Sequence, residues 1–87
     1  MTKQDFLTMI ENDSPFLAEY RVIVDRLSMS SNVLGCYQEN GNWKVYATSD
    51  KGKVSIYKVT TKEEEAFEYL SRMIKKKTDI LKKSYGF

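Results

Sequence analysis

Side chains that commonly do chemistry are scarce in this sequence of 87 residues. It has no histidine and one cysteine, Cys36, so it offers no imidazole or thiolate cluster for zinc, iron or copper and no disulfide within the chain. Catalytic dyads built on histidine are absent as well. The carboxylates of Glu39 and Asp50 fall in different turns, and Gly41 and Gly52 match turns rather than a phosphate-binding loop. We therefore expect no enzyme, no metal or cofactor, and no small-molecule substrate.

The residue types best suited to binding are tyrosines in the middle of the chain. Tyr37, Tyr46 and Tyr57 belong to three strand-like patterns, with Lys44 among them. Tyrosine is enriched at interfaces because its ring offers a large contact area at little cost in rotamer entropy. On an open sheet face these four side chains would form a partner-binding surface. The alternative is that the tyrosines only stabilise the sheet, by about 0.2–1 kcal/mol per cross-strand pair.

A hydrophobic period of two predicts the strands that would carry these tyrosines. Polar and apolar side chains alternate across 33–39, 43–49 and 53–59. Asn40-Gly41 between the first two runs suits a type I′ turn, which predicts a tight hairpin and fixes its register.

That register separates two faces of the hairpin. One face pairs Gln38 with Trp43, Cys36 with Val45 and Leu34 with Ala47, and the other pairs Tyr37 with Lys44, Gly35 with Tyr46 and Val33 with Thr48. We expect Trp43 and Cys36 to be buried in the core. A second turn around 50–52 would bring Val54 and Ile56 to the core face and Tyr57 beside Tyr46.

Helical patterns precede the strands. Phe6, Leu7 and Ile10 predict a short helix that ends at 12–13. Ser14 and Pro15 then suit the N-cap and first residue of a second helix. Its apolar stripe runs to about residue 27 and consists of Phe16, Tyr20, Ile23, Val24 and Leu27.

A long helix follows the strands. Thr61 and Glu64 have the spacing of a capping box, which predicts a helix from about Lys62 to Lys82. Its apolar stripe consists of Ala66, Phe67, Leu70, Met73, Ile74 and Leu81.

Together these elements predict a single α+β domain over residues 1–87. It would contain one or two N-terminal helices, a three-stranded antiparallel meander and a long C-terminal helix packed on one sheet face. A chain of this size builds one core. The sequence contains neither a run of about 20 apolar residues nor a secretory signal pattern, so we expect a cytoplasmic protein with no membrane partner.

Charge is unevenly distributed. Residues 1–40 carry three basic and six acidic side chains, and residues 41–87 carry eleven and six. The last predicted helix opens with Glu63, Glu64, Glu65 and Glu68 and closes with Lys75, Lys76, Lys77, Lys82 and Lys83. The helix dipole favours this order, so the lysines are either a solvated helix end or a basic patch for an acidic partner.

Two stretches, 35–52 and 61–70, resemble a family of small immunity proteins from bacterial polymorphic-toxin systems, catalogued as immunity protein fifty-nine. The matching residues are Gly35, Tyr37, Trp43, Val45, Tyr46, Thr48, Gly52, Ala66, Phe67, Tyr69 and Leu70. Ala47, Ser49 and Asp50 depart from the Glu, Asp and Glu that the family shows there, so two acidic charges of the loop are missing. The resemblance implies a cytosolic antitoxin that binds a cognate toxin domain, and it assigns no contact residues.

Two surfaces could bind such a toxin. The sheet face with Tyr37, Lys44, Tyr46 and Tyr57 offers aromatic anchors and is our preferred prediction. The other candidate is acidic and consists of Glu11, Asp13, Glu19 and Asp25.

Other function classes stay open. The order helix, three strands, helix also matches the double-stranded RNA-binding domain. Those domains place lysines at the start of the last helix, but residues 63–65 of this chain are glutamates, which repel phosphate. We therefore expect that nucleic acid is not the partner. A phage or accessory interaction module that oligomerises through the same face is a third interpretation.

Overall fold

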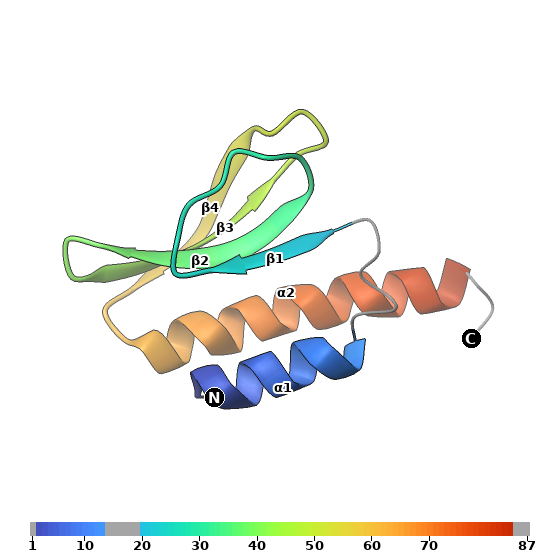
Figure 1. The fold of residues 1–87 in the computed structure, drawn as a ribbon, viewed down its shortest axis with the longest axis horizontal. Helices are drawn as coiled ribbons and strands as arrows, with labels where there is room; N and C mark the ends of the chain where they lie inside the picture. The colour runs from blue at the N-terminus through green and yellow to red at the C-terminus, as the bar shows by residue number, and fades with distance from the viewer. Residues whose placement is uncertain (1, 14–19, 85–87) are drawn as a thin grey trace.

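The computed structural model describes residues 2–13 and 20–84, with side chains for 2–11 and 20–77. Its elements are α1 (Lys3–Asp13), β1 (Arg21–Val24), β2 (Val33–Glu39), β3 (Asn42–Thr48), β4 (Val54–Thr60) and α2 (Glu63–Ser84). The strands form one sheet in the order β1-β2-β3-β4, and both helices lie on the same side of it (Figure 1). The α+β class and the long C-terminal helix are as predicted, but the sheet is four-stranded and mixed rather than three-stranded and antiparallel.

The hairpin of β2 and β3 confirms the prediction from the Asn-Gly turn. Asn40 and Gly41 have φ of 52° and 81°, as a type I′ turn requires. The observed register pairs Glu39 with Asn42, and every pair from there to Leu34 with Ala47 is the predicted one. Turn chemistry therefore decides which side chains face the helices.

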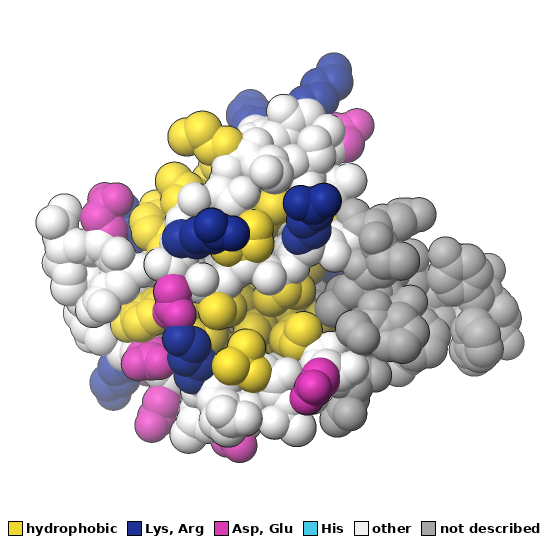
Figure 2. Space-filling model, in the orientation of Figure 1, with side chains coloured by type: hydrophobic (Ala, Val, Ile, Leu, Met, Phe, Trp, Pro, Cys, Tyr) yellow, Lys and Arg dark blue, Asp and Glu magenta, His cyan; other side chains and the backbone are white. Residues whose placement is uncertain are grey.

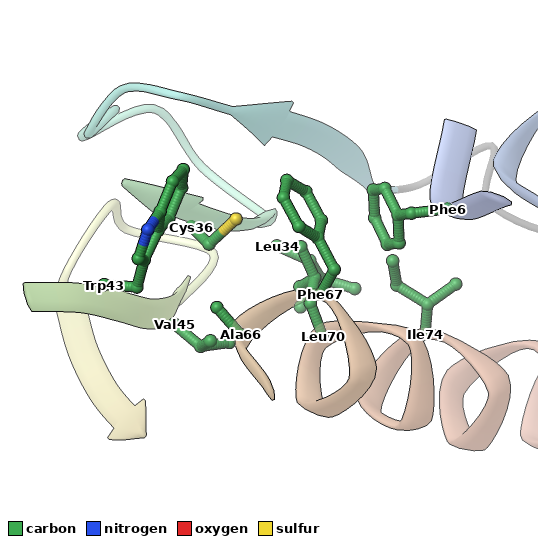
Figure 3. Packing of buried hydrophobic residues seen from close by; sticks show 9 residues of the cluster. All are labelled: Phe6, Leu34, Cys36, Trp43, Val45, Ala66, Phe67, Leu70 and Ile74. Atoms are coloured by element: carbon green, nitrogen blue, oxygen red, sulfur yellow. The ribbon is translucent and has the colours of Figure 1, made fainter. Parts of the chain in front are cut away.

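The core lies between the sheet and the two helices. Figure 3 shows Phe67 reaching from α2 toward the strands, near Phe6 from α1 and Cys36 from β2. The ring centroid of Phe67 lies 5.2 Å from that of Phe6 and 5.7 Å from that of Trp43. Trp43 is only 8% exposed and Cys36 is fully buried, so both predictions of core positions are confirmed.

The apolar stripe predicted for the C-terminal helix is confirmed over its described part. Ala66, Phe67, Leu70 and Ile74 are fully buried, and Met73 packs against them. The Leu81 side chain lies outside the described residues. Burying each large member contributes about 1.5–3 kcal/mol, so this stripe fixes α2 to the sheet.

The prediction of a second helix up to about residue 27 is wrong for its described part, because residues 21–24 form the strand β1. This strand pairs in parallel with β2, from Arg21 opposite Val33 to Val24 opposite Cys36. Val22 and Val24 pack on the core, and this spacing of two fits a strand, whereas the predicted helical stripe uses Ile23 and Val24. β-branched side chains lose less rotamer freedom in a strand, which favours the observed element. The predicted cap at 14–15 lies outside the described residues.

The pairing of β3 with β4 differs from the prediction because a bulge interrupts it between Val45 and Tyr46. Val54 pairs with Thr48 and Ile56 with Tyr46, so Val54 and Ile56 lie on the face away from the helices. The prediction that they face the core is therefore wrong. A bulge adds one residue to one strand and cannot be read from an alternating pattern.

The start of α2 also differs in detail. The helix begins at Glu63, and the hydroxyl of Thr60 donates to Glu65 Oε2 at 2.6 Å, one residue outside each predicted capping-box position. This hydrogen bond lowers the pKa of the Glu65 carboxyl. The Thr60 oxygen also accepts from the Lys62 N–H at 3.1 Å. No helix among the described residues is both long enough and apolar enough to cross a membrane.

Candidate functional site

The sheet face opposite the helices is not open, because the chain between β1 and β2 crosses it. We call residues 25–32 the connector. Its ends, Asp25 and Asn32, have φ of 70° and 55°, a backbone conformation that Asp and Asn tolerate better than most residues. Parallel strands must be joined by a segment that returns along the sheet, and here the connector does so without a helix.

Tyr46 lies beneath the connector and is 0% exposed. Its hydroxyl donates to the Arg26 carbonyl at 2.9 Å and accepts from the Ser28 N–H at 3.0 Å. The prediction that Tyr46 lines an exposed surface is therefore wrong. Two backbone hydrogen bonds satisfy the phenol, so the residue holds the connector to the sheet.

Thr48 is a second anchor of the connector. Its hydroxyl donates to the Ser30 carbonyl at 2.6 Å and accepts from the Val33 N–H at 2.7 Å. Two glycines allow a close approach here: Gly35 lets β1 and the Tyr46 ring approach, and Gly52 leaves room for the connector. A Cβ on Gly35 would lie 2.2 Å from the Ile23 carbonyl oxygen, and one on Gly52 would lie 2.4 Å from that of Met29.

These contacts explain most of the residues that resemble the immunity family. Tyr46, Thr48 and Gly52 contact the connector, and Gly35 lets β1 and the Tyr46 ring approach. Trp43, Val45, Ala66, Phe67 and Leu70 are core residues. These nine of the eleven matching positions build the fold.

Tyr37 and Lys44 face away from the helices as predicted, but both are half-buried. The Tyr37 ring packs edge-on against Tyr46, with centroids 5.7 Å apart and planes at 71°. Lys44 Nζ pairs with Glu39 Oε1 at 3.3 Å. These contacts fit the alternative interpretation, in which such side chains stabilise the sheet.

Tyr57 is 54% exposed but is not beside Tyr46. It is the extra residue of the bulge and lines a groove next to α2 together with Ala47 and Tyr69. The structure therefore divides the four predicted site residues between both sides of the sheet.

Strand β4 carries the exposed apolar side chains that sequence reasoning missed. Ile56 is 45% exposed and Val59 is 53% exposed, and β4 is an outer strand of the sheet. The alternation of apolar and polar residues in 53–59 does indicate a strand, but the bulge turns Ile56 from the predicted core face to the solvent face. Together with Tyr57, these residues form the β4 surface.

A groove of about 680 Å³ lies between α2 and the helix-facing side of β3 and β4. It is lined by Lys53 and Tyr57 from the sheet side and by Tyr69, Arg72 and Lys76 from the helix. The structure therefore separates the predicted lysine cluster: Lys76 and Lys77 line this groove, Lys75 is not among the lining residues, and the side chains of 82–83 lie outside the described residues.

A second apolar area lies between β1 and α1. Figure 2 shows hydrophobic side chains at the surface between the strands and the helices in this region. Lys3 of α1 forms an ion pair with Asp25 at the end of β1. Asp25 is thus paired, and the Asp13 and Glu19 side chains of the predicted acidic surface lie outside the described residues.

The buried titratable groups are suited to structure rather than to reaction. Burial raises the pKa of the Cys36 thiol to about 12, which keeps it protonated and weakly nucleophilic. Burial also raises the pKa of Tyr46. Among residues 2–11 and 20–77 there is no group of three or more Cys, Asp and Glu side chains placed to hold a metal ion.

Comparison of the chain with protein-family models, curated proteins and solved structures finds no match. The resemblance to the immunity family therefore depends on the matching residues alone.

Proposed function

We propose that this protein binds and neutralises a cognate bacterial toxin domain, and that the toxin docks on the β4 surface. The observation that carries the proposal is the exposure of Ile56, Tyr57 and Val59 along one outer strand of the sheet. Ile56 and Val59 share the face away from the helices, and exposed apolar side chains that lie together mark interaction sites on small proteins. The resemblance to immunity proteins supplies the class of partner.

The backbone of β4 adds to this surface. β4 pairs with β3 along one edge only, so its other edge presents N–H and C=O groups to which a partner strand can add. Because the bulge directs Tyr57 toward the groove, a strand docked here meets Ile56 and Val59 on one side and Tyr57 on the other. Main-chain bonds would give affinity, and these side chains would give selectivity.

The β4 surface is too small to form a stable interface by itself. Full burial of a large apolar side chain contributes about 1.5–3 kcal/mol, so completing the burial of a half-exposed one contributes roughly half of that. Stable interfaces bury about 800 Å² on each partner. The toxin must therefore also contact neighbouring surface, for which Lys53, just before β4, and Lys58, within it, provide positive charge.

The test is the affinity of the chain for the toxin domain encoded beside its gene. The variant Ile56→Ala/Val59→Ala removes two anchors that contribute little to the core, because each is about half exposed. We expect the Kd, measured by isothermal titration calorimetry, to rise about tenfold or more. Thermal unfolding checks that the variant stays folded.

The matched control is Leu7→Ala, which truncates a similarly exposed apolar side chain on α1. We expect its Kd to stay within about twofold of the parent value. A toxin that binds the double variant as tightly as the parent, or one that loses affinity equally with Leu7→Ala, would contradict the β4 surface as the docking site.

A further inference from the structure

The groove next to α2 has two walls of different origin. Figure 1 shows that the sheet and α2 approach each other where β4 leads into the helix and diverge toward the turn between β3 and β4. The groove occupies this widening space, and its volume of about 680 Å³ is typical of ligand-binding clefts. Its apolar lining includes Leu34, Ala47 and Met73.

Positive charge comes from both walls. Lys53 lies on the sheet side, and Arg72, Lys76 and Lys77 lie on the helix side. Arg72 and Lys76 are four residues apart and so share one face of α2. Among the described lining residues Asp50 is the one carboxylate, so cations outnumber anions. We call this cleft the basic groove.

Aromatic rings lie beside these cations. Tyr57 and Tyr69 line the groove, and Lys77 Nζ lies 5.4 Å from the centroid of the Tyr20 ring. The groove thus combines an apolar interior with cationic positions around it. A ligand complementary to both would carry carboxylates next to an apolar side chain.

We infer that the basic groove binds an acidic peptide segment of the partner protein, in which one apolar or aromatic side chain is flanked by carboxylates. This inference rests on the proposed function, because it names the chemistry of the toxin segment that docks there. Ser55 and Tyr57 belong to β4 and also line the groove. A strand added to β4 would direct alternate side chains toward the helix side, where the groove lies.

The surface around the groove favours a short acidic segment over a nucleic acid. Tyr69 and Arg72 also line a neighbouring depression that contains Glu64, Glu65 and Glu68. Arg72 itself pairs with Glu68 Oε1 at 3.5 Å. A long polyanion that left the groove in this direction would meet carboxylates, which repel phosphate. A peptide of a few residues ends within the basic region.

The test uses a fluorescent synthetic peptide with one phenylalanine flanked by glutamates, and a matched peptide in which glutamines replace the glutamates. We expect the protein to bind the glutamate peptide about tenfold more tightly in fluorescence anisotropy, and the difference to shrink as salt is raised. Lys76→Glu should weaken binding of the glutamate peptide by about tenfold or more, because it reverses a charge in the groove.

Lys75→Glu is the matched control, because it makes the same charge change at the adjacent helix position outside the groove lining. It should alter the Kd of the glutamate peptide by less than about threefold. Equal affinity for the two peptides, equal effects of the two variants, or tighter binding of duplex RNA than of the glutamate peptide would overturn the inference.

The same variants distinguish this inference from the proposed function. A toxin domain that binds the parent chain and the Lys76→Glu variant equally, while the glutamate peptide does not bind, overturns the basic groove and leaves the β4 surface standing. Selective binding of the glutamate peptide, weakened by Lys76→Glu, supports the groove even where the toxin domain fails to bind.

Discussion

Tyr46 shows how one hydroxyl changes the interpretation of a surface. From the sequence it is a tyrosine on an exposed sheet face, but its hydroxyl bonds to the backbone at Arg26 and Ser28. Nothing in the alternation of β3 reveals that the connector crosses above it. Trp43 and Cys36, in contrast, could be placed correctly because their neighbours across the hairpin follow from the turn. Residue types predicted the core better than the binding site.

The raised pKa values of the buried Cys36 thiol and Tyr46 phenol predict how stability depends on pH. The pKa of the Cys36 thiol rises from an ordinary value near 9 to about 12 in the folded state, and that of Tyr46 is also raised. Above pH 9 the unfolded chain loses these protons while the folded chain keeps them. The free energy of unfolding should therefore fall as pH rises from about 9 toward 12, by up to about 1.4 kcal/mol per pH unit from Cys36, and the raised pKa of Tyr46 acts in the same direction.

Urea unfolding of the parent and of Cys36→Ala at several alkaline pH values measures this effect. The variant should be less stable near neutral pH because it loses a buried side chain, but its stability should decline less steeply above pH 9. Parallel declines for the two proteins would show that Cys36 does not ionise on unfolding as expected.

Among the helices and strands, the sequence predicts correctly those features that a turn type or a hydrophobic period determines. Asn40-Gly41 fixes the β2–β3 register, and the stripe from Ala66 to Ile74 fixes the buried face of α2. The run Arg21–Val24 fits either a helical or a strand period, and only its parallel pairing with β2 decides between them. The bulge in β4 likewise depends on tertiary contacts, so the exposed β4 surface could not be derived from the pattern.

The close packing around Gly35 leads to a prediction for its replacement by alanine. In Gly35→Ala the new Cβ would lie within 3 Å of both the Ile23 carbonyl oxygen of β1 and Tyr46 Oη, so β1 and the Tyr46 ring that holds the connector must shift. We expect a loss of about 1–3 kcal/mol in stability and faster hydrogen exchange of the Ser28 amide, whose acceptor is Tyr46.

Gly41→Ala is the control for this prediction. Its Cβ would meet no atom within 4 Å, but its φ of 81° would strain the hairpin turn. It should lower stability without selectively exposing the Ser28 amide. Unchanged Ser28 exchange in Gly35→Ala would contradict the role assigned to the glycine.

Across the whole molecule, the fold leaves two kinds of surface for a partner. One is the apolar area between β1 and α1 seen in Figure 2, and the other is the β4 surface with the adjoining basic groove. The second combines an unpaired strand edge, exposed apolar side chains and excess positive charge within one region. As an outer strand of a helix-covered sheet, β4 is therefore suited to pair with a partner strand. Self-association through β4 would use the same edge and would appear as a concentration-dependent dimer.

The proposed docking on β4 is best tested by hydrogen–deuterium exchange of the protein with and without the proposed toxin partner. The account predicts slower exchange on binding for amides of 54–60, with smaller changes along α1 and β1. Protection confined to α1 and β1, with unchanged exchange across β4 in a complex that forms, would contradict the assignment of the docking surface.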